Sequence, residues 1–448
     1  MATHDEIVHT RRAFIRRGLM LASATATVPF FLDRTAWAIA DPFDAAPVGS
    51  KPGAKDHRVL VVLQLAGGND GLNTVIPFRN DLYYKARPRL GIAGNEVLRL
   101  NDDIGLHPKA TGLKQLYDEG RLAIVQGVGY PNPNRSHFIS TDIWATADPK
   151  QRVHEGWVGR YFDCTCSGRD RPDPKLGIAL TGESPLALRG ERFRPVSFSS
   201  PEELSWRGPA ARGAGLDAFK KLNASKPGAS PAAETLADEA SALAFLKRTA
   251  MDARASAREI QQAAGATIRP GRGRGRGLRF PRGGNRRGGA LGRQLHTVKR
   301  MIAGGMKTRV YYVSFGGFDT HAGQLGRQQN LLAQLAEALS GFVEELEHDG
   351  LLDRVTVMTF SEFGRRVAEN ASQGTDHGAA APLFVVGSRI RPGLHGEHPS
   401  LEPDRLDQGD LRWQTDFRSV YAAVLSGWMK TDARRVLGGD FEKLALFR

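Results

Sequence analysis

Residues 59–65 read VLVVLQL, and this apolar run leads through Ala66 into GGND at 67–70. Two later stretches repeat the arrangement, with VYYVSF at 310–315 before GGFDTH at 316–321 and VTVMTF at 355–360 before SEFGR at 361–365. Short β-branched runs of this kind are typical of buried strands in a parallel sheet. Ligands of such sheets bind where the carboxyl ends of the strands meet their loops. The sequence therefore predicts a site at one edge of a sheet.

Strands alternate with helices along most of the chain. We expect strands at 59–65, 122–126, 176–180, 195–199, 309–315, 354–360 and 382–387. Helices are predicted at 108–119, 231–264, 291–304, 324–348 and 415–429. This order predicts an α/β fold with a mainly parallel sheet and helices on both faces.

The N-terminus has the features of an export signal. Arg11 and Arg12 are followed by an apolar stretch at 19–32 and by small residues at 38–40. We expect a twin-arginine signal segment at 1–40, a linker at 41–56 and a single α/β domain at 57–448. The apolar stretch is shorter than the roughly 18 residues that span a bilayer, so the mature chain should have no stable membrane span. The expected location is the periplasm or the extracellular space.

The formal charge of +14 is concentrated in two segments. Eight arginines lie in a Gly/Arg-rich, low-complexity stretch at 269–289, and five more lie in the signal segment. Such a stretch cannot build a core, and we interpret it as a surface insertion. The alternative is an RNA- or DNA-binding arm, but only Phe280 supplies an aromatic ring within it. No nucleic-acid partner is expected.

Asp319 and His321 form the first candidate metal-ligand pair. They are two residues apart, so in an extended segment their side chains point the same way and can bind one ion. A carboxylate oxygen and an imidazole nitrogen suit zinc or manganese. The alternative is that Asp319 caps the helix beginning near Gln324.

Four further residues complete the candidate metal ligands: Asp70, Glu362, Asp376 and His377. Glu362 directly follows a strand, although it could instead pair with Arg365 or Arg366. We expect His377 to be a ligand and Asp376 to orient it. Asp70 follows two glycines, a sequence that is also common in turns.

Ser136 is the candidate nucleophile, since it follows a predicted strand and precedes a predicted helix. Arg135 beside it could hold an oxyanion. The alternative is that Asn134 or Ser136 only caps the helix.

Several of these motifs resemble those of a large bacterial family of twin-arginine-exported proteins of unknown function, which is related to the alkaline phosphatase and sulfatase superfamily. The motifs are GNDGLN at 68–73, NRSHF at 134–138, GFDTH at 317–321, SEFGR at 361–365 and GTDHG at 374–378. The resemblance covers residues 57–448 except the Gly/Arg-rich insertion. It implies an alkaline phosphatase/sulfatase-like fold in which Asp70, Ser136, Asp319, His321 and His377 match metal-site and nucleophile positions. Phe363 stands where the superfamily has a histidine, which puts a second metal ion in doubt.

Two functions are compatible with these residues. The first is a metal-dependent hydrolase of phosphate or sulfate esters, with one or two divalent ions, zinc or manganese, and an anionic ester as substrate. The second is a non-catalytic binding or assembly protein of the cell envelope that retains the fold and has an envelope protein partner.

Overall fold

The computed structural model describes residues 58–166, 172–204, 256–265 and 287–448. In this part of the chain nine strands form a mixed, mostly parallel sheet. The strand order is β11-β5-β10-β9-β1-β8-β6-β7, with β12 paired to β5. Strand β1 (Val59–Ala66) lies between β8 (Val310–Gly316) and β9 (Val355–Phe360) and is parallel to both. The predicted fold class, α/β with a mainly parallel sheet, is confirmed.

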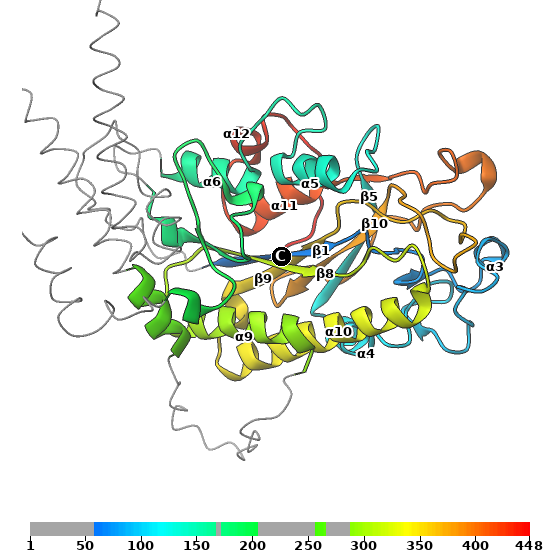
Figure 1. Cartoon of the computed structure of the whole chain (residues 1–448), viewed down its shortest axis with the longest axis horizontal. Helices are drawn as coiled ribbons and strands as arrows, with labels where there is room; N and C mark the ends of the chain where they lie inside the picture. The colour runs from blue at the N-terminus through cyan, green and yellow to red at the C-terminus, as the bar shows by residue number, and fades with distance from the viewer. Residues whose placement is uncertain (1–57, 167–171, 205–255, 266–286) are drawn as a thin grey trace, which may run out of the picture.

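Helices cover both faces of the sheet (Figure 1). One face carries α4 (Thr111–Asp118), α9 (Gly289–Ala303) and α10 (Gln324–His348). The other carries α5 (His137–Thr146), α6 (Trp157–Thr165), α11 (Phe417–Ala423) and α12 (Ala433–Leu437). Alternate residues of β1 therefore enter two different cores, Leu60 and Val62 on one side and Val61 and Leu63 on the other. Because both faces are covered, the strand has to be apolar along nearly its whole length.

The remaining strands are short or lie toward the sides of the sheet. They are β5 (Leu122–Gly129), β6 (Gly177–Leu180), β7 (Val196–Ser197), β10 (Ala381–Gly387), β11 (Gly393–His395) and β12 (Thr415–Asp416). A separate three-stranded sheet contains β2 (Val75–Ile76), β3 (Leu98–Arg99) and β4 (Gly105–Leu106), and α3 (Asp81–Ala86) follows β2.

Most predicted elements are present, with three differences. The strand expected at 195–199 is only two residues long. The last helix ends at Ala423 and continues as a π-helix over Val424–Trp428. Residues 287–289, assigned to the Gly/Arg-rich insertion, belong to the folded part, since α9 begins at Gly289.

Several expectations fall on residues outside the described part. These are the signal segment, the linker, most of the insertion and the helix at 231–264 before residue 256; residues 256–265 are helical. Among the described residues, no helix is both long and apolar enough to cross a membrane.

The strand register brings four loops to one edge of the sheet. Ala66 at the end of β1 lies opposite Gly316 of β8, and Gln64 lies opposite Phe360 of β9. Strand β10 runs antiparallel to β5 and β9, so it begins where those strands end, with Ala381 opposite Val128. The loops that follow β1, β5 and β8 and the loop that joins β9 to β10 therefore open at the same place.

Candidate metal centre

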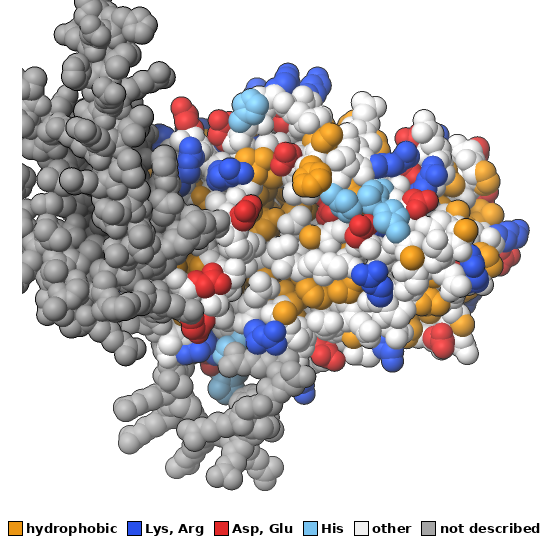
Figure 2. Space-filling model, in the orientation of Figure 1, with side chains coloured by type: hydrophobic (Ala, Val, Ile, Leu, Met, Phe, Trp, Pro, Cys, Tyr) orange, Lys and Arg blue, Asp and Glu red, His pale blue; other side chains and the backbone are white. Residues whose placement is uncertain are grey.

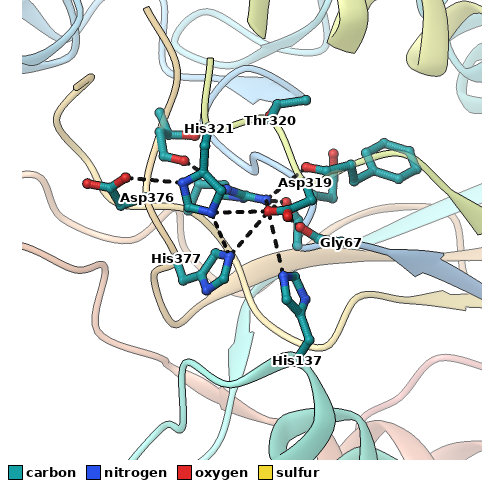
Figure 3. Close-up of polar contacts among 12 residues, drawn as sticks. Gly67, His137, Asp319, Thr320, His321, Asp376 and His377 are labelled. Carbon is teal, nitrogen blue, oxygen red and sulfur yellow. Dashed lines mark hydrogen bonds and ion pairs between the residues drawn. The ribbon is translucent and has the colours of Figure 1, made fainter. Parts of the chain in front are cut away.

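Three histidines and one aspartate converge at this edge (Figure 3). Asp319 and His321 follow β8, His377 lies in the loop before β10, and His137 is the first residue of α5. The Nε2 atoms of His321 and His377 each lie 3.2 Å from Asp319 Oδ1 and 2.9 Å from each other. His137 Nε2 lies 3.6 Å from the same oxygen. We call these four residues the histidine group.

Glycines allow the backbone segments of the site to approach closely. Gly67 has a φ of 118°, and a Cβ there would lie 2.4 Å from the backbone nitrogen of Asp319. Gly374 has the same role for His321, since a Cβ there would lie 2.2 Å from the carbonyl carbon of that residue. His377 is positioned by backbone pairing with Arg365. The two loops that carry the imidazoles are therefore fixed by main-chain contacts.

Each imidazole is held through its Nδ1 atom. The contacts are His137 to Glu362 Oε1 at 2.8 Å, His321 to Asp376 Oδ1 at 3.1 Å and His377 to the carbonyl oxygen of Arg135 at 2.8 Å. Carboxylate and carbonyl oxygens only accept hydrogen bonds, so in each case Nδ1 is the donor. A neutral imidazole that is protonated at Nδ1 has a lone pair on Nε2. All three rings therefore present the nitrogen that binds metals toward Asp319.

This arrangement favours a proton or a metal ion between the imidazoles. Two Nε2 lone pairs 2.9 Å apart repel each other unless a proton or a metal ion lies between them. A tetrahedral ion with bonds of about 2.0–2.1 Å holds its ligand atoms roughly 3.3 Å apart, close to the separations observed. His137, Asp319 and His377 each offer a ligand atom within 4.8 Å of the others. The donor set therefore fits a divalent metal ion, and the group could hold one.

The ionisation states at neutral pH also suit metal binding. Burial alone would raise the pKa of Asp319, but the hydrogen bond from Arg365 and the close contact with His377 outweigh it and lower the pKa to about 2. Burial lowers the pKa of His377 below its usual value, against the opposing effect of the Arg135 carbonyl and the Asp319 carboxylate, both of which favour the protonated ring. Asp319 is therefore a carboxylate and His377 is neutral, as metal ligands must be.

Arg365 supplies a fixed positive charge beside the histidine group. Its side chain is fully buried and donates through Nη2 to Asp319 Oδ1 at 2.7 Å. The same guanidinium donates to the carbonyl oxygens of Gly67, Gly68, Phe318 and Thr375. Arg365 thus ties the ends of β1 and β8 to the loop before β10.

The structure places the other predicted ligands differently. Glu362 was predicted to bind metal or to pair with Arg365 or Arg366. Its Oε1 accepts from His137 Nδ1 and from the backbone N–H of Gly67 at 2.8 Å, and its buried Oε2 has no hydrogen-bond partner among the described residues. Asp376 was expected to orient His377, but its hydrogen bond goes to His321. Both carboxylates therefore accept a hydrogen bond from the Nδ1 atom of an imidazole, the ring nitrogen that points away from Asp319.

Asp70 is buried and held by a cation. Its Oδ2 pairs with Arg87 Nη1 at 2.5 Å and accepts from the Gln324 amide, whereas Oδ1 has no hydrogen-bond partner among the described residues. None of the contacts described for its side chain involves the histidine group.

Ser136 stands at the N-cap of α5, directly before His137. Its backbone N–H donates to Asn134 Oδ1 at 2.8 Å, but its hydroxyl makes no capping hydrogen bond. The alternative in which the Ser136 side chain caps the helix is therefore wrong. The guanidinium of Arg135 pairs with Asp410, and its carbonyl fixes His377.

His137 is the site residue that the sequence did not single out as a ligand. Its only signal was its place after Ser136 in the NRSHF stretch. Phe363 packs under two of the imidazoles, with ring centroids 4.8 Å from His137 and 4.5 Å from His377. A ring therefore supports the ligands at the position where the family resemblance suggested a further histidine.

The fold and the site together define a mostly parallel α/β protein with a histidine and carboxylate group at the ends of its central strands. The chain belongs to the family described as Protein of unknown function (DUF1501), whose model matches residues 57–410. No curated protein matches the chain.

Among solved structures the chain is similar to the lipoteichoic acid synthase LtaP from Listeria monocytogenes, at 11% identity over 84% of this chain and 79% of that one, with a TM-score of 0.30. It is also similar to the PsFucS1 sulfatase from Pseudoalteromonas sp., at 10% identity over 92% of this chain and 72% of that one, with a TM-score of 0.33.

Proposed function

We propose that the protein is a metal-dependent hydrolase of phosphate or sulfate esters, with the divalent ion held by the histidine group. The observation that carries the proposal is the orientation of the three imidazoles, each fixed through Nδ1 with its Nε2 toward Asp319. Nitrogen and oxygen ligands in this number suit zinc or manganese. When bound, such an ion neutralises charge on the ester and activates a nucleophile.

The charges around the histidine group support an anionic substrate. Three guanidinium groups and four carboxylates surround the site. Arg135 and Arg366 pair with Asp410 and Arg365 pairs with Asp319, whereas Glu362 and Asp376 pair with His137 and His321. The balance is one negative charge, so a divalent ion makes the site net positive. The site would then attract an ester anion, and only in the metal-loaded state.

Ser136 has the proposed role of nucleophile. It lies at the start of a ten-residue helix and directly before the candidate ligand His137. The helix dipole favours negative charge at this end, so it stabilises the alkoxide form of the hydroxyl. Because the hydroxyl is not used as a cap, attack on an ester does not require the helix end to open.

The contacts favour one ion rather than two. A second ion would have to recruit Asp70 or Glu362. Asp70 is already paired with Arg87, and Glu362 already holds His137 through Oε1. Each carboxylate has one further buried oxygen without a hydrogen-bond partner among the described residues, Asp70 Oδ1 and Glu362 Oε2. Two oxygens alone do not complete a four-coordinate site.

One observation favours a second candidate function, a non-catalytic binding or assembly protein. The buried guanidinium of Arg365 already lies on Asp319, so part of the site's negative charge is neutralised without a metal ion. A protein that keeps this fold for binding alone would retain the site's structure without turnover.

Replacing the candidate nucleophile distinguishes the two functions. Metal-loaded protein should hydrolyse 4-nitrophenyl phosphate or 4-nitrophenyl sulfate, and Ser136→Ala should lower kcat by at least about 1000-fold because the covalent route is lost. Metal content should stay unchanged in that variant, because Ser136 has no described contact with the histidine group's nitrogens. Exposed Ser199→Ala is the matched control and should retain activity.

The two candidate functions predict different results for the wild type and for Ser136→Ala. Metal binding without turnover of either ester by the wild type would favour the binding protein. Turnover that survives in Ser136→Ala would contradict the role of Ser136.

A further inference from the structure

Beside the histidine group, two arginines share one buried carboxylate. The side chain of Asp410 is only 1% exposed and lies between Arg135 and Arg366. Arg135 donates to Oδ2 through Nε at 2.9 Å and through Nη2, and Arg366 donates to Oδ1 through Nε at 3.2 Å. The two arginine side chains are 40% and 38% exposed. Arg135 therefore uses one edge of its guanidinium on Asp410 and Arg366 uses its Nε, and both side chains keep part of their surface in solvent.

The backbone fixes both arginines next to the candidate metal ligands. The carbonyl oxygen of Arg135 accepts from His377 Nδ1 at 2.8 Å. The backbone N–H of Arg366 donates to the carbonyl oxygen of Asp376 at 3.0 Å, and Asp376 is the residue that orients His321. Figure 2 shows histidine side chains gathered on one face of the molecule with basic and acidic side chains directly beside them.

The pair of arginines carries an excess positive charge that Asp410 cannot neutralise. Two guanidinium groups against one carboxylate leave one positive charge on these three residues, part of which the nearby Asp376 carboxylate offsets. Arg366 also donates through Nη2 to the carbonyl oxygen of Gln408, a residue with a φ of 53°, so its guanidinium is held in place before any ligand arrives. A planar, fixed guanidinium recognises carboxylate, phosphate and sulfate groups through paired hydrogen bonds. The exposed parts of the two groups are therefore suited to an anion.

We propose that Arg366, paired through Asp410 with Arg135, forms a second anion subsite beside the metal centre. It would bind a negatively charged group that the substrate carries in addition to its ester. The substrate class is then an ester with a second carboxylate, phosphate or sulfate, such as one unit of a polyanionic chain. This inference rests on the proposed function, because the ester itself has to bind at the histidine group.

Two phosphonates of equal length test the subsite without requiring turnover. Propylphosphonate has one anionic end, and 3-phosphonopropionate has an anionic group at both ends. Isothermal titration calorimetry on the metal-loaded full chain should show at least about tenfold tighter binding of 3-phosphonopropionate, as expected for a charge-assisted contact. In Arg366→Gln the two phosphonates should bind with affinities within about twofold of each other, because the paired N–H groups of the guanidinium that bind the second anion are gone.

Two further variants make the result specific. Arg434→Gln removes the same charge from α12, where Arg434 is 71% exposed, and should keep the tenfold preference. Arg366→Lys keeps a cation for buried Asp410 and should fold normally. Its preference for 3-phosphonopropionate over propylphosphonate should be smaller than in the wild type, because an ammonium group lacks the planar pair of N–H donors.

Failure of the inference differs from failure of the proposed function. Equal affinity for the two phosphonates in metal-loaded wild type, or an undiminished preference in Arg366→Gln, would overturn the subsite and leave the metal centre standing. A chain that takes up no divalent metal would overturn the proposed function and the subsite with it.

Discussion

At the scale of single residues, the hydrogen bonds of the three histidine Nδ1 atoms determine whether the Nε2 atoms can bind a metal ion. Glu362, Asp376 and the Arg135 carbonyl each accept a hydrogen bond from the Nδ1–H group of one imidazole. These contacts leave no proton on the inner nitrogens, which face one another and Asp319. Residues that do not contact the proposed ion therefore fix the orientation and the protonation of the imidazoles, and the binding site depends on them as well as on the ligands.

Removing one of these outer contacts should weaken metal binding. The Asp376 side chain is 55% exposed, and a hydrogen bond from Asn370 is the main reason that its pKa is lowered, so it remains a carboxylate acceptor for His321. Asp376→Ala should lower the affinity for zinc or manganese by about 10- to 100-fold, measured by titration against a metal-sensitive dye. Exposed Asp440→Ala is the control for the loss of one surface carboxylate. Equal affinity in Asp376→Ala and wild type would show that His321 is not a ligand.

Individual site residues were only partly predictable from the sequence. Asp319 and His321 were identified because they follow an apolar run and His377 because it precedes one, and these three lie together. The partner of Asp376 could not be predicted, since whether it reaches His321 or His377 depends on how two loops distant in the sequence pack together. Asp70 follows a strand in the same way, but the buried partner Arg87 is visible only in three dimensions.

At the scale of elements, the close packing of strand ends brings the ligands together. Strands β1 and β8 are in register to their last residues, and Phe318 N–H donates to the Ala66 carbonyl beyond the ladder at 3.2 Å. Gly67 and Phe318 then lie against each other without a side chain between them. The position of Asp319 is thus a consequence of how β1 ends.

Adding a methyl group at Gly67 should displace Asp319. Its φ of 118° disfavours any side chain, and the Cβ would collide with backbone atoms that cannot move separately. Gly67→Ala should cost about 1–3 kcal/mol in the free energy of unfolding and should also weaken metal binding. Chemical denaturation gives the first quantity and metal titration the second.

Gly326→Ala is the matched control for this substitution. Gly326 lies at an exposed position of helix α10, where a Cβ would have no other atom within 4 Å, and its φ is not positive. That variant should be neutral or stabilised, because alanine favours a helix over glycine. A Gly67→Ala protein with wild-type stability and metal affinity would contradict the close packing of β1 and β8 at the site.

The elements themselves were well predicted because their signals are local. Helix α10 has the bounds expected from its helical spacing, Gln324–His348, and β1, β8 and β9 agree to within one residue. The antiparallel direction of β10 was not evident, since an apolar run does not indicate the direction of a strand. The π-helix after Ala423 was also missed, because a one-residue insertion leaves the apolar character of the segment unchanged.

At the scale of the whole molecule, one sheet separates two cores and carries the site at its edge. The segments that build the site come from residues 67–70, 130–137, 316–321 and 361–380, so the site exists only when the whole sheet is formed. The export signal expected at 1–40 and the Gly/Arg-rich stretch lie outside this folded part, except for 287–289, and their roles remain predictions from the sequence.

The central claim is that the histidine group holds a divalent metal ion. The most direct measurement is the metal content of the purified full chain by elemental analysis after equilibration with zinc or manganese and removal of free metal. We expect about one ion per chain, lost when Asp319→Ala and His377→Ala are combined, and a higher Tm with metal than with chelator, since a ligand of the native state stabilises it.

Asp404→Ala combined with His154→Ala removes the same two side-chain types from exposed positions and should keep the ion. A wild-type chain that retains no stoichiometric metal and has the same Tm in chelator would contradict the claim.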